Sequence, residues 1–217
     1  MKDTYRHKGL RKRLIDTLYQ KGIRDERILK AFDLVPRHLF LDKAFEEWAY
    51  TDKAFPIGNK QTISQPFTVA YQTDLLEIAP SDKVLEIGTG SGFQAAILAT
   101  LGATVFTVER QELLHKKTNQ LLAKLGFDRI RTFLKDGNDG LPKFAPFDKI
   151  IVTAAATEIP TALLSQLNIG GILIIPIGKD RQQMCKIIKK SKKQYKRIYL
   201  DYFKFVPLLK GLNKDFG

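Results

Sequence analysis

The chain has 217 residues, of which 44% are apolar and 27% charged, and its formal net charge is +13 at pH 7. This length suits one large domain, and the apolar content is sufficient for a packed core. The apolar runs are too short to cross a bilayer, and the charged N-terminal segment lacks the apolar core of a signal peptide. The single cysteine, Cys185, excludes an intrachain disulfide and fits a reducing compartment. We therefore expect a cytoplasmic monomer with no membrane segment and no metal.

The positive charge is concentrated toward the C-terminus. From Lys179 onward, 12 Lys and Arg face 3 Asp, so this part carries +9 of the net charge. A basic balance is typical of proteins with anionic partners, nucleic acid first among them. Lysines also protect an exposed sheet edge from pairing with other chains, so KIIKKSKKQYKR equally fits a solvated edge strand and turn. We favour the edge strand and expect no specific nucleic-acid partner.

Helical spacing dominates the first third of the chain. Residues 6–21 repeat apolar side chains at helical intervals, Asp25 can cap a second helix that runs to about Phe32, and residues 43–50 suggest a short helix. Another helix begins near Pro66. Its apolar face is expected to consist of Phe67, Tyr71, Leu75 and Ile78.

From residue 83 the pattern alternates between strands and helices. Five strands are expected at KVLEI, ATVFTVE, RIRTFLKD, FDKIIVTAA and GILIIPIG, with helices such as GFQAAILATL between them. This alternation predicts right-handed crossovers and a mainly parallel sheet covered on both faces. The last third reads as antiparallel strands. The predicted fold is an α/β, doubly wound, mainly parallel sheet in a single domain over 1–217, with an N-terminal helical cap and substrate segment (1–65), a cofactor-binding core (66–182) and an antiparallel C-terminal edge (183–217).

A glycine-rich loop follows the first of these strands. Ligands of open parallel sheets bind outside the carboxyl ends of the strands, where Gly88, Gly90 and Gly92 are expected. Glycine lets the backbone approach a ligand closely. The spacing is GxGxG, and Phe93 stands where the dinucleotide fingerprint has Gly or Ala, which disfavours a nicotinamide cofactor. Glu109 ends the second strand and can accept hydrogen bonds from ribose hydroxyls.

Glu86 stands at the end of the first strand, just before the loop. A carboxylate there suits a cationic ligand and would repel a pyrophosphate. S-adenosylmethionine carries a sulfonium charge and no phosphate. Glu86 could instead bind a loop N–H or a lysine. Together with Glu109 and the glycines it favours an S-adenosylmethionine site of the methyltransferase type.

Further candidate cofactor contacts lie beside these residues. Thr89 is within the glycine loop, and Arg110 follows the acid at the end of the second strand. Asp136 and Gly137 follow the third strand, where an adenine edge would lie. The sequence DGNDG is also dense in turn formers, so a plain turn fits Asp136 equally well.

A polar stretch, GNKQTISQP, precedes the helix that begins near Pro66. Ser64 or Gln65 could cap this helix, since proline suits the first helical turn. Alternatively, the hydroxyl of Ser64 touches a substrate, while Thr62, Ile63 and Gln65 cover the reacting groups. The residues alone leave these two interpretations open.

These motifs together resemble the protein-L-isoaspartate O-methyltransferase family over nearly the whole chain. The resemblance rests on VPRHLF, AFPIG followed by QTISQP, VLEIGTGSGFQAAILA, FDKIIVTAAA, GGILIIPIG with QQM, and FVPL. Asn59 and Lys60 depart from the usual pattern, which puts only fine substrate preference in doubt. The end of the chain varies in this family, so the segment 209–217 receives no role.

The resemblance implies a Rossmann-like methyltransferase sandwich that uses S-adenosyl-L-methionine to methylate isoaspartyl-containing peptides and proteins. It also implies that Ser64 is the active-site serine. An isoaspartyl residue has a free α-carboxyl, which is ionised at pH 7 and needs no general base. The methyl ester formed there would close spontaneously to a succinimide, which hydrolyses partly to normal aspartate, so the enzyme would initiate repair.

Two other functions compete with this one. The net charge would suit a nucleic-acid methyltransferase. Base N-methylation, however, uses an Asn/Asp-Pro-Pro-aromatic turn after the fourth strand, where this chain has TAAATEIP. Cytosine C5 methylation needs a nucleophilic cysteine, and Cys185 lies beyond the fifth strand. A basic, non-catalytic binding module on the same fold is the other alternative, and the intact glycine loop with Glu109 argues against it.

Overall fold

The structure is a computed structural model that describes residues 2–214. The first residue of the predicted segment 1–65 and the last three of 183–217 lie outside the described residues. The chain opens with the helical cap. Leu14 and Leu18 of its first helix are buried. The carboxylate of Asp25 accepts a hydrogen bond from the Arg27 amide at 2.8 Å, so Asp25 caps the N-terminus of the second helix as predicted. The cap consists of α1 (Tyr5–Gln20), α2 (Glu26–Leu34) and two 3-10 turns, η1 (Arg37–Phe40) and η2 (Lys43–Trp48).

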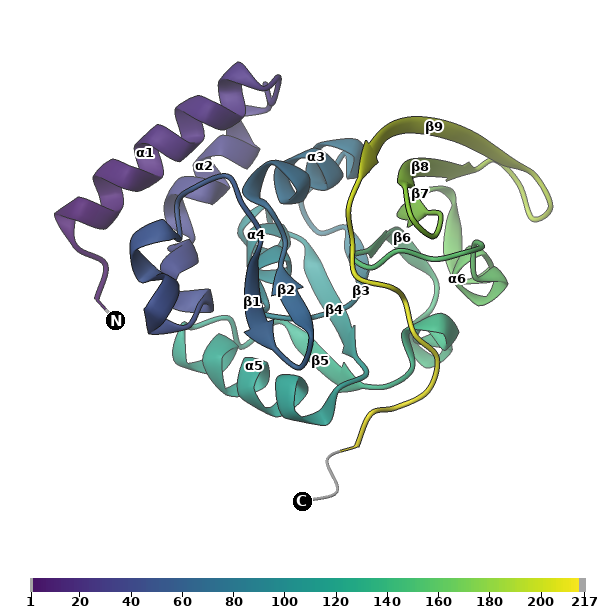
Figure 1. Ribbon diagram of the computed structural model, residues 1–217. Helices are drawn as coiled ribbons and strands as arrows, with labels where there is room; N and C mark the ends of the chain where they lie inside the picture. The colour runs from purple at the N-terminus through teal and green to yellow at the C-terminus, as the bar shows by residue number, and fades with distance from the viewer. Residues whose placement is uncertain (1, 215–217) are drawn as a thin grey trace.

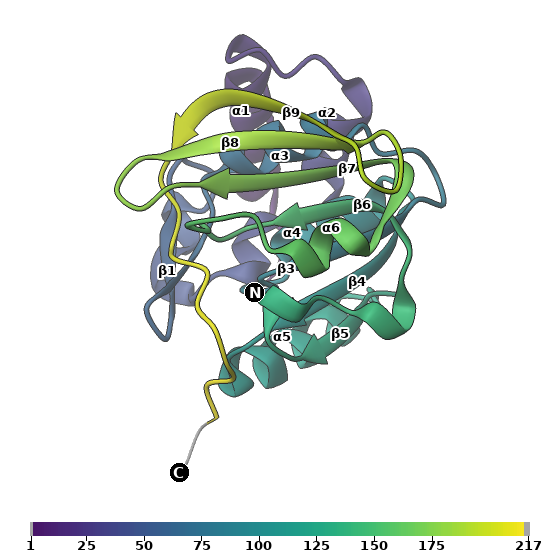
Figure 2. The same cartoon turned by 90° about the vertical axis from the view of Figure 1, so that its right-hand side faces the viewer.

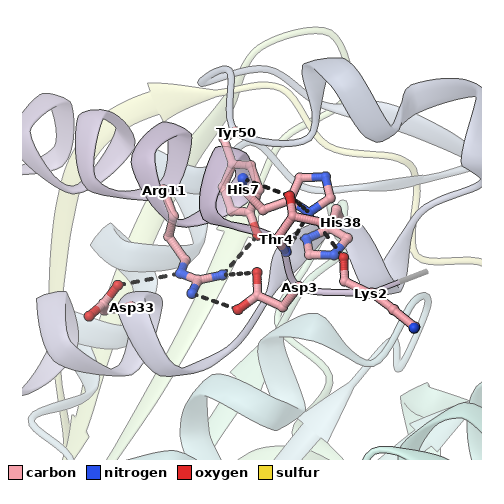
Figure 3. A network of polar contacts seen from close by, with 8 residues as sticks. All are labelled: Lys2, Asp3, Thr4, His7, Arg11, Asp33, His38 and Tyr50. Atoms are coloured by element: carbon pink, nitrogen blue, oxygen red, sulfur yellow. Dashed lines mark hydrogen bonds and ion pairs between the residues drawn. The ribbon is translucent and has the colours of Figure 1, made fainter.

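A polar network ties the parts of this cap together, and within it His7, Arg11, His38 and Tyr50 are buried (Figure 3). The guanidinium of Arg11 donates to both carboxylate oxygens of Asp3, at 3.1 and 3.0 Å, and to the hydroxyl of Tyr50 at 3.1 Å. His7 and His38 stack with ring centroids 3.9 Å apart. Hydrogen bonds between buried partners are costly to leave unmade, so the network fixes α1 against η1 and the segment that follows η2.

A two-stranded hairpin follows the cap and was not expected from the sequence. It consists of β1 (Phe55–Gly58) and β2 (Gln61–Ile63), with Phe55 opposite Ile63. Its two loop residues, Asn59 and Lys60, have φ of +50° and +57°. Positive φ at both positions is typical of the tight turn whose twist matches a hairpin. Its second strand leads directly into Ser64.

The helix after the hairpin is α3 (Pro66–Leu76), which starts at the predicted proline. Phe67, Tyr71 and Leu75 of the predicted apolar face are half-buried and pack against the core, and Ile78 is buried in the core but lies beyond the helix end. Smaller or polar side chains face the sheet instead, since the helix packs closely on β6 and β7. The buried residues are Pro66, Thr68, Val69, Ala70, Gln72, Thr73 and Leu76.

The central sheet has the order β5-β4-β3-β6-β7-β8-β9 in the described part of the chain. The first five of these strands pair in parallel and the last two are antiparallel, as predicted. Their bounds are β3 (Lys83–Ile87), β4 (Thr104–Glu109), β5 (Arg131–Leu134), β6 (Phe147–Val152), β7 (Leu167–Ile177), β8 (Gln182–Lys189) and β9 (Tyr195–Phe203). The next two strands in the sequence, β4 and β5, lie on one side of β3, and β6 and β7 lie on its other side. Open parallel sheets bind ligands where the strand order reverses in this way.

The two faces of the sheet bury different side chains, as the alternation along each strand requires. Val84 packs under the helices α1 to α5, whereas Leu85 packs on the opposite face with Phe106 and Phe147. The helical cap thus lies outside α3 and α4, and α6 covers part of the other face (Figures 1 and 2). The remaining elements are α4 (Phe93–Thr100), α5 (Glu112–Lys124), α6 (Thr161–Ser165), and the 3-10 turns η3 (Gly137–Asp139) and η4 (Pro142–Phe144).

The basic C-terminal part forms the antiparallel edge of the sheet. Two of its lysines are buried and used within the fold: Lys189 donates to the carbonyls of Leu164 and Leu167 at 3.1 and 2.6 Å, and Lys186 pairs with Glu77 at 2.5 Å. After β9 the chain returns across the carboxyl ends of the strands toward α5 (Figure 1).

Candidate active site

A cavity lies at the carboxyl ends of the parallel strands. Ligands of open parallel sheets bind at this place. Its walls come mainly from the hairpin strand β2 and the residues after it, the glycine loop with the start of α4, the ends of β4 and β6, the start of η3, and the returning C-terminal segment. Of the predicted site residues, it is lined by Thr62, Ile63, Ser64, Gly88, Thr89, Gly90, Glu109, Arg110 and Gly137.

The glycine loop is shaped by steric limits at two positions. Gly88 has φ +99°, and a Cβ there would lie 2.5 Å from the hydroxyl oxygen of Thr153. Gly92 has φ +85°, starts α4, and would place a Cβ 2.8 Å from Thr118. Both conformations strongly favour glycine. Gly92 does not line the cavity, so its part in the site is to let α4 pack against α5.

Glu109 lies where the sequence places a ribose acceptor. Its side chain is buried, and its two carboxylate oxygens accept from the amides of Gly90 at 3.0 Å and Gln111 at 2.9 Å. Each carboxylate oxygen can accept more than one hydrogen bond. The backbone therefore fixes the carboxylate at the cavity wall and leaves acceptor capacity for a bound diol.

Glu86 does not line the cavity, which corrects the expectation of direct contact with the cofactor. It is fully buried, and Thr107, its partner in the β3–β4 register, donates to it at 2.5 Å. The hydroxyls of Thr107 and Thr89 lie 2.8 Å apart, so a short chain of hydrogen bonds runs from Glu86 to the glycine loop. Burial, and secondarily the charge of Glu109, raises the pKa of Glu86 to about 8. Glu86 thus has its partner within the protein, but this partner is the Thr107 hydroxyl and not the loop N–H or lysine that the alternative interpretation named.

Asp136 likewise points away from the cavity. Its carboxylate accepts from the Asn138 amide at 2.9 Å and from the Gly211 amide at 2.5 Å. Burial would raise the pKa of Asp136, but these hydrogen bonds outweigh it and lower the pKa. Asp136 thus forms the turn that the alternative interpretation predicted, and it holds the returning C-terminal segment, while Gly137 beside it lines the cavity.

Ser64 has an uncommitted hydroxyl. It is half-buried in the cavity wall, and its Oγ makes no hydrogen bond to any of residues 2–214. The helix after it is capped from elsewhere: Asp52 accepts from the Phe67 amide at 2.8 Å and from the side chain of Gln65 at 2.9 Å. Neither Ser64 nor Gln65 caps α3 with its side chain. The capping interpretation of Ser64 is therefore wrong.

Several cavity residues were missed by the sequence analysis. Gln94 and Gln111 line the cavity, and their buried side-chain oxygens have no hydrogen-bond partner within the described chain. Such atoms in a cavity wall are candidates for bonds to a ligand. The position of Gln94 as the second residue of the helix after the glycine loop was the available signal. The other missed lining residues include Thr153, Ala154, Val206, Pro207, Leu208 and Leu209.

The segment 209–217 had received no role, yet its first residues border the cavity. Leu209 lines it, and Arg110 donates to the carbonyls of Lys210 and Gly211 at 3.3 and 2.8 Å. The sequence contains no periodic pattern that reveals a strap of this kind, because these contacts are made by backbone atoms.

The donor and acceptor groups of the cavity fit S-adenosylmethionine. The glycine loop brings bare backbone to the cavity, Glu109 offers an acceptor for a ribose, and the free oxygens of Gln94 and Gln111 offer acceptors for ammonium or hydroxyl protons. No phosphate-binding cluster of Arg or Lys lines it; among the described lining residues Arg110 is the only cation.

One group of potential metal ligands occurs among the described residues, in the helical cap. Ligand atoms of Asp3, His7 and His38 lie within 4.8 Å of one another. All three serve the network of the cap: Asp3 binds Arg11, His7 Nδ1 accepts from the Thr4 amide at 3.2 Å, and His38 Nδ1 lies 2.7 Å from the Tyr50 hydroxyl. None of them lines the cavity.

Comparisons with known proteins show the family of this chain. A family model described as Protein-L-isoaspartate(D-aspartate) O-methyltransferase (PCMT) matches residues 9–213. The chain is 54% identical to a protein-L-isoaspartate O-methyltransferase of Christiangramia forsetii and 56% identical to one of Flavobacterium psychrophilum. In both cases the match covers 98% of this chain and 100% of the relative.

Solved structures give the same result. A protein-L-isoaspartate O-methyltransferase superposes with a TM-score of 0.85 at 29% identity, covering 93% of this chain and 67% of that one. A putative member from Plasmodium falciparum, in complex with S-adenosyl-L-homocysteine, superposes with a TM-score of 0.78 at 25% identity, covering 94% and 99%. No described helix is long and apolar enough to cross a membrane. The chain belongs to the protein-L-isoaspartate (D-aspartate) O-methyltransferase family.

Proposed function

We propose that this chain methylates the free α-carboxyl of L-isoaspartyl residues with Ser64 as the residue that holds the acceptor carboxylate. The observation that carries this assignment is the free hydroxyl of Ser64 in the wall of the cofactor cavity. The reaction uses S-adenosyl-L-methionine and starts the repair of damaged proteins through a succinimide.

The chemistry asks little of the protein in acid–base terms. When bound, S-adenosylmethionine supplies an electrophilic methyl group on a sulfonium and accepts the electron pair of the broken bond as a neutral thioether. The acceptor carboxylate is ionised at neutral pH and gives up no proton. The chain's own residues therefore have to bind, align and exclude water.

Alignment is assigned to the segment between β2 and α3. Ser64 Oγ donates to one carboxylate oxygen, so that the other oxygen faces the methyl group. Thr62 and Ile63 cover the reacting groups from the side of the hairpin, and Gln65 is held back by its bond to Asp52. None of the described lining residues is a histidine, which suits a reaction without proton transfer.

Cofactor binding is assigned to the strand ends. Glu109 accepts from the ribose, the loop from Gly88 to Gly90 gives close backbone approach, and Gly137 and Arg110 border the adenine side. Glu86 and Asp136 act as positioning residues, through Thr107 and through the C-terminal segment respectively.

We extend the proposal to the whole chain, which acts as one domain and as a monomer in the cytoplasm. Support comes from the cavity walls, which draw on each of the predicted segments 1–65, 66–182 and 183–217. Lys186 and Lys189 in the basic C-terminal part bind Glu77 and the Leu164 carbonyl within the protein. These two lysines are therefore not available to phosphates, which supports the expectation that no nucleic acid is bound specifically.

The test is methyl transfer to a synthetic isoaspartyl peptide, with the isomeric peptide containing normal aspartate and bulk RNA as controls. We expect base-labile methyl ester on the isoaspartyl peptide alone. Base-stable methylation of the RNA, or equal transfer to both peptides, would contradict the proposal.

A further inference from the structure

A second cavity adjoins the first and shares part of its wall. The residues common to both are Thr62, Ser64, Thr153 and Val206. The remaining walls of the second cavity come from the residue before β1, the start of α3 and the run from the end of β9 onward. The acceptor peptide must reach Ser64 from the side that the cofactor does not occupy, and this cavity opens there.

The wall of this second cavity is aromatic and only half-buried. Phe67, Phe203 and Phe205 line it together with Ala54. Partly exposed rings next to a reaction centre gain free energy when an apolar side chain covers them. The polar residues Asp201, Tyr202 and Lys204 also line it and are exposed.

The rings contact one another and neighbouring side chains. Phe67 and Phe203 stack with centroids 6.5 Å apart, and Phe203 and Phe205 are 6.4 Å apart. The ammonium of Lys21 lies 5.3 Å from the centre of the Phe67 ring, and its partner Asp52 caps α3. These contacts limit the movement of the rings, and restricted movement lowers the entropic cost of binding.

The occupant follows from the covalent structure of the acceptor. In an isoaspartyl residue the α-carboxyl sits on the Cα that follows the preceding peptide bond, and the chain continues through the β-carbonyl. The Cα atoms of both neighbouring residues are only a few bonds from the methylated carboxyl. With that carboxyl on Ser64, a neighbouring side chain falls within reach of the adjoining wall.

We propose that Ala54, Phe67, Phe203 and Phe205 form a subsite that takes a large apolar side chain next to the isoaspartyl residue. This inference rests on the proposed function of Ser64. It assigns a substrate preference for isoaspartyl residues with Leu, Phe or a similar residue beside them, over those flanked by glycine.

The experiment compares kcat/KM for isoaspartyl peptides that carry Leu or Gly immediately before, or immediately after, the isoaspartyl residue. In one of the two positions Leu should exceed Gly by roughly 10- to 100-fold, the range for a side chain filling an apolar pocket. Ala54 is exposed, so Ala54→Trp should fill the subsite without disturbing the core, and the Leu/Gly ratio should fall toward one. Ala54→Leu is a milder filling if the Trp variant folds poorly.

Tyr199→Ala is the matched control, because this aromatic residue lies on β9, is 53% exposed and does not line the subsite. It should keep both the Leu/Gly ratio and the rate on the glycine peptides. Equal kcat/KM for the Leu and Gly peptides in both positions would overturn the subsite, and so would a Leu/Gly ratio in Ala54→Trp as high as in the wild type. Either result would leave the proposed methyl transfer unchallenged. Absence of transfer to every isoaspartyl peptide would instead overturn the proposed function and the subsite with it.

Discussion

Ser64 and Glu109 both line the cavity, but their side-chain oxygens differ in their hydrogen bonds to the rest of the protein. Both carboxylate oxygens of Glu109 accept from backbone amides, whereas the hydroxyl of Ser64 has no partner in the described chain. A group held by the backbone is suited to a fixed cofactor. A group with a free hydroxyl can follow a substrate that arrives and leaves.

Replacing Glu109 by Ala should weaken S-adenosylmethionine binding by roughly 1–3 kcal/mol, the cost of a lost hydrogen bond to a charged acceptor. The change also frees the amide of Gly90, so the glycine loop loses an anchor. Calorimetric titration measures the affinity, and Asp128→Ala, an exposed acid between α5 and β5, is the control. Unchanged affinity in the Glu109 variant would remove this residue from the cofactor site.

Glu86 predicts a dependence of stability on pH. Its pKa in the folded protein, about 8, lies above the ordinary value of 4.5. The folded state therefore favours the protonated form of Glu86. The resulting contribution to the free energy of unfolding is complete below about pH 4.5 and is lost as the pH rises to about 8. Glu86→Gln mimics the protonated form and should remove the loss, which is on the order of several kcal/mol at about 1.4 kcal/mol for each unit of pKa shift.

Urea unfolding at about pH 5 and about pH 8.5 measures this difference. The wild type should lose stability relative to Glu86→Gln between the two values. Glu47→Gln, at a side chain 62% exposed, should follow the wild type. A parallel decline in Glu86→Gln and the wild type would show that the pH dependence arises elsewhere.

At the level of elements, the junction of the hairpin with α3 decides where Ser64 lies. Asp52 accepts from the Phe67 amide and from Gln65, and it pairs with Lys21 on the cap at 2.6 Å. One carboxylate thus anchors the residues on the far side of Ser64, while β2 anchors the residues before it. The serine is held from both ends without using its own hydroxyl.

Asp52→Ala should lower the unfolding free energy by about 1 kcal/mol, the usual cost of a lost helix cap. It should also lower kcat on an isoaspartyl peptide, because the segment 64–67 loses its anchor, while cofactor affinity is kept. Asp16→Ala, an exposed acid on α1, is the control for both measurements. A loss of stability with unchanged kcat would mean that Ser64 is positioned by the hairpin alone.

The sequence predicted the strands and the cofactor loop more successfully than the parts that enclose the site. Apolar alternation and glycine spacing are local signals, and they located β3, β4 and the carboxylate of Glu109. The hairpin was missed because its turn, Asn59-Lys60, lacks glycine and its strands are short. The sequence left the cap of α3 open, because Asp52, which supplies it, lies outside the segment before the helix, and such tertiary contacts leave no periodic signal.

At the scale of the whole molecule, the excess positive charge and the candidate active site lie on different parts of the chain. Lys196 and Arg197 lie exposed on β9, the open edge of the sheet, and Lys190, Lys192 and Lys193 lie exposed in the turn before it, where lysine opposes pairing with other chains. The cavity at the strand ends contains one cation and one acid among its described lining residues, Arg110 and Glu109. This separation fits an enzyme that recognises a carboxylate by one hydroxyl rather than by a charged patch.

The central claim is that the Ser64 hydroxyl orients the acceptor carboxylate, and kcat for Ser64→Ala on an isoaspartyl peptide tests it most directly. We expect kcat to fall by roughly 10²–10³, the range for one oriented hydrogen bond to a reacting oxygen. Cofactor affinity and the thermal midpoint should stay near wild type, since the hydroxyl makes no bond within residues 2–214. Ser191→Ala, in the turn between β8 and β9, should match the wild type in all three. Near-normal kcat in Ser64→Ala, with or without a lowered midpoint, would contradict the account.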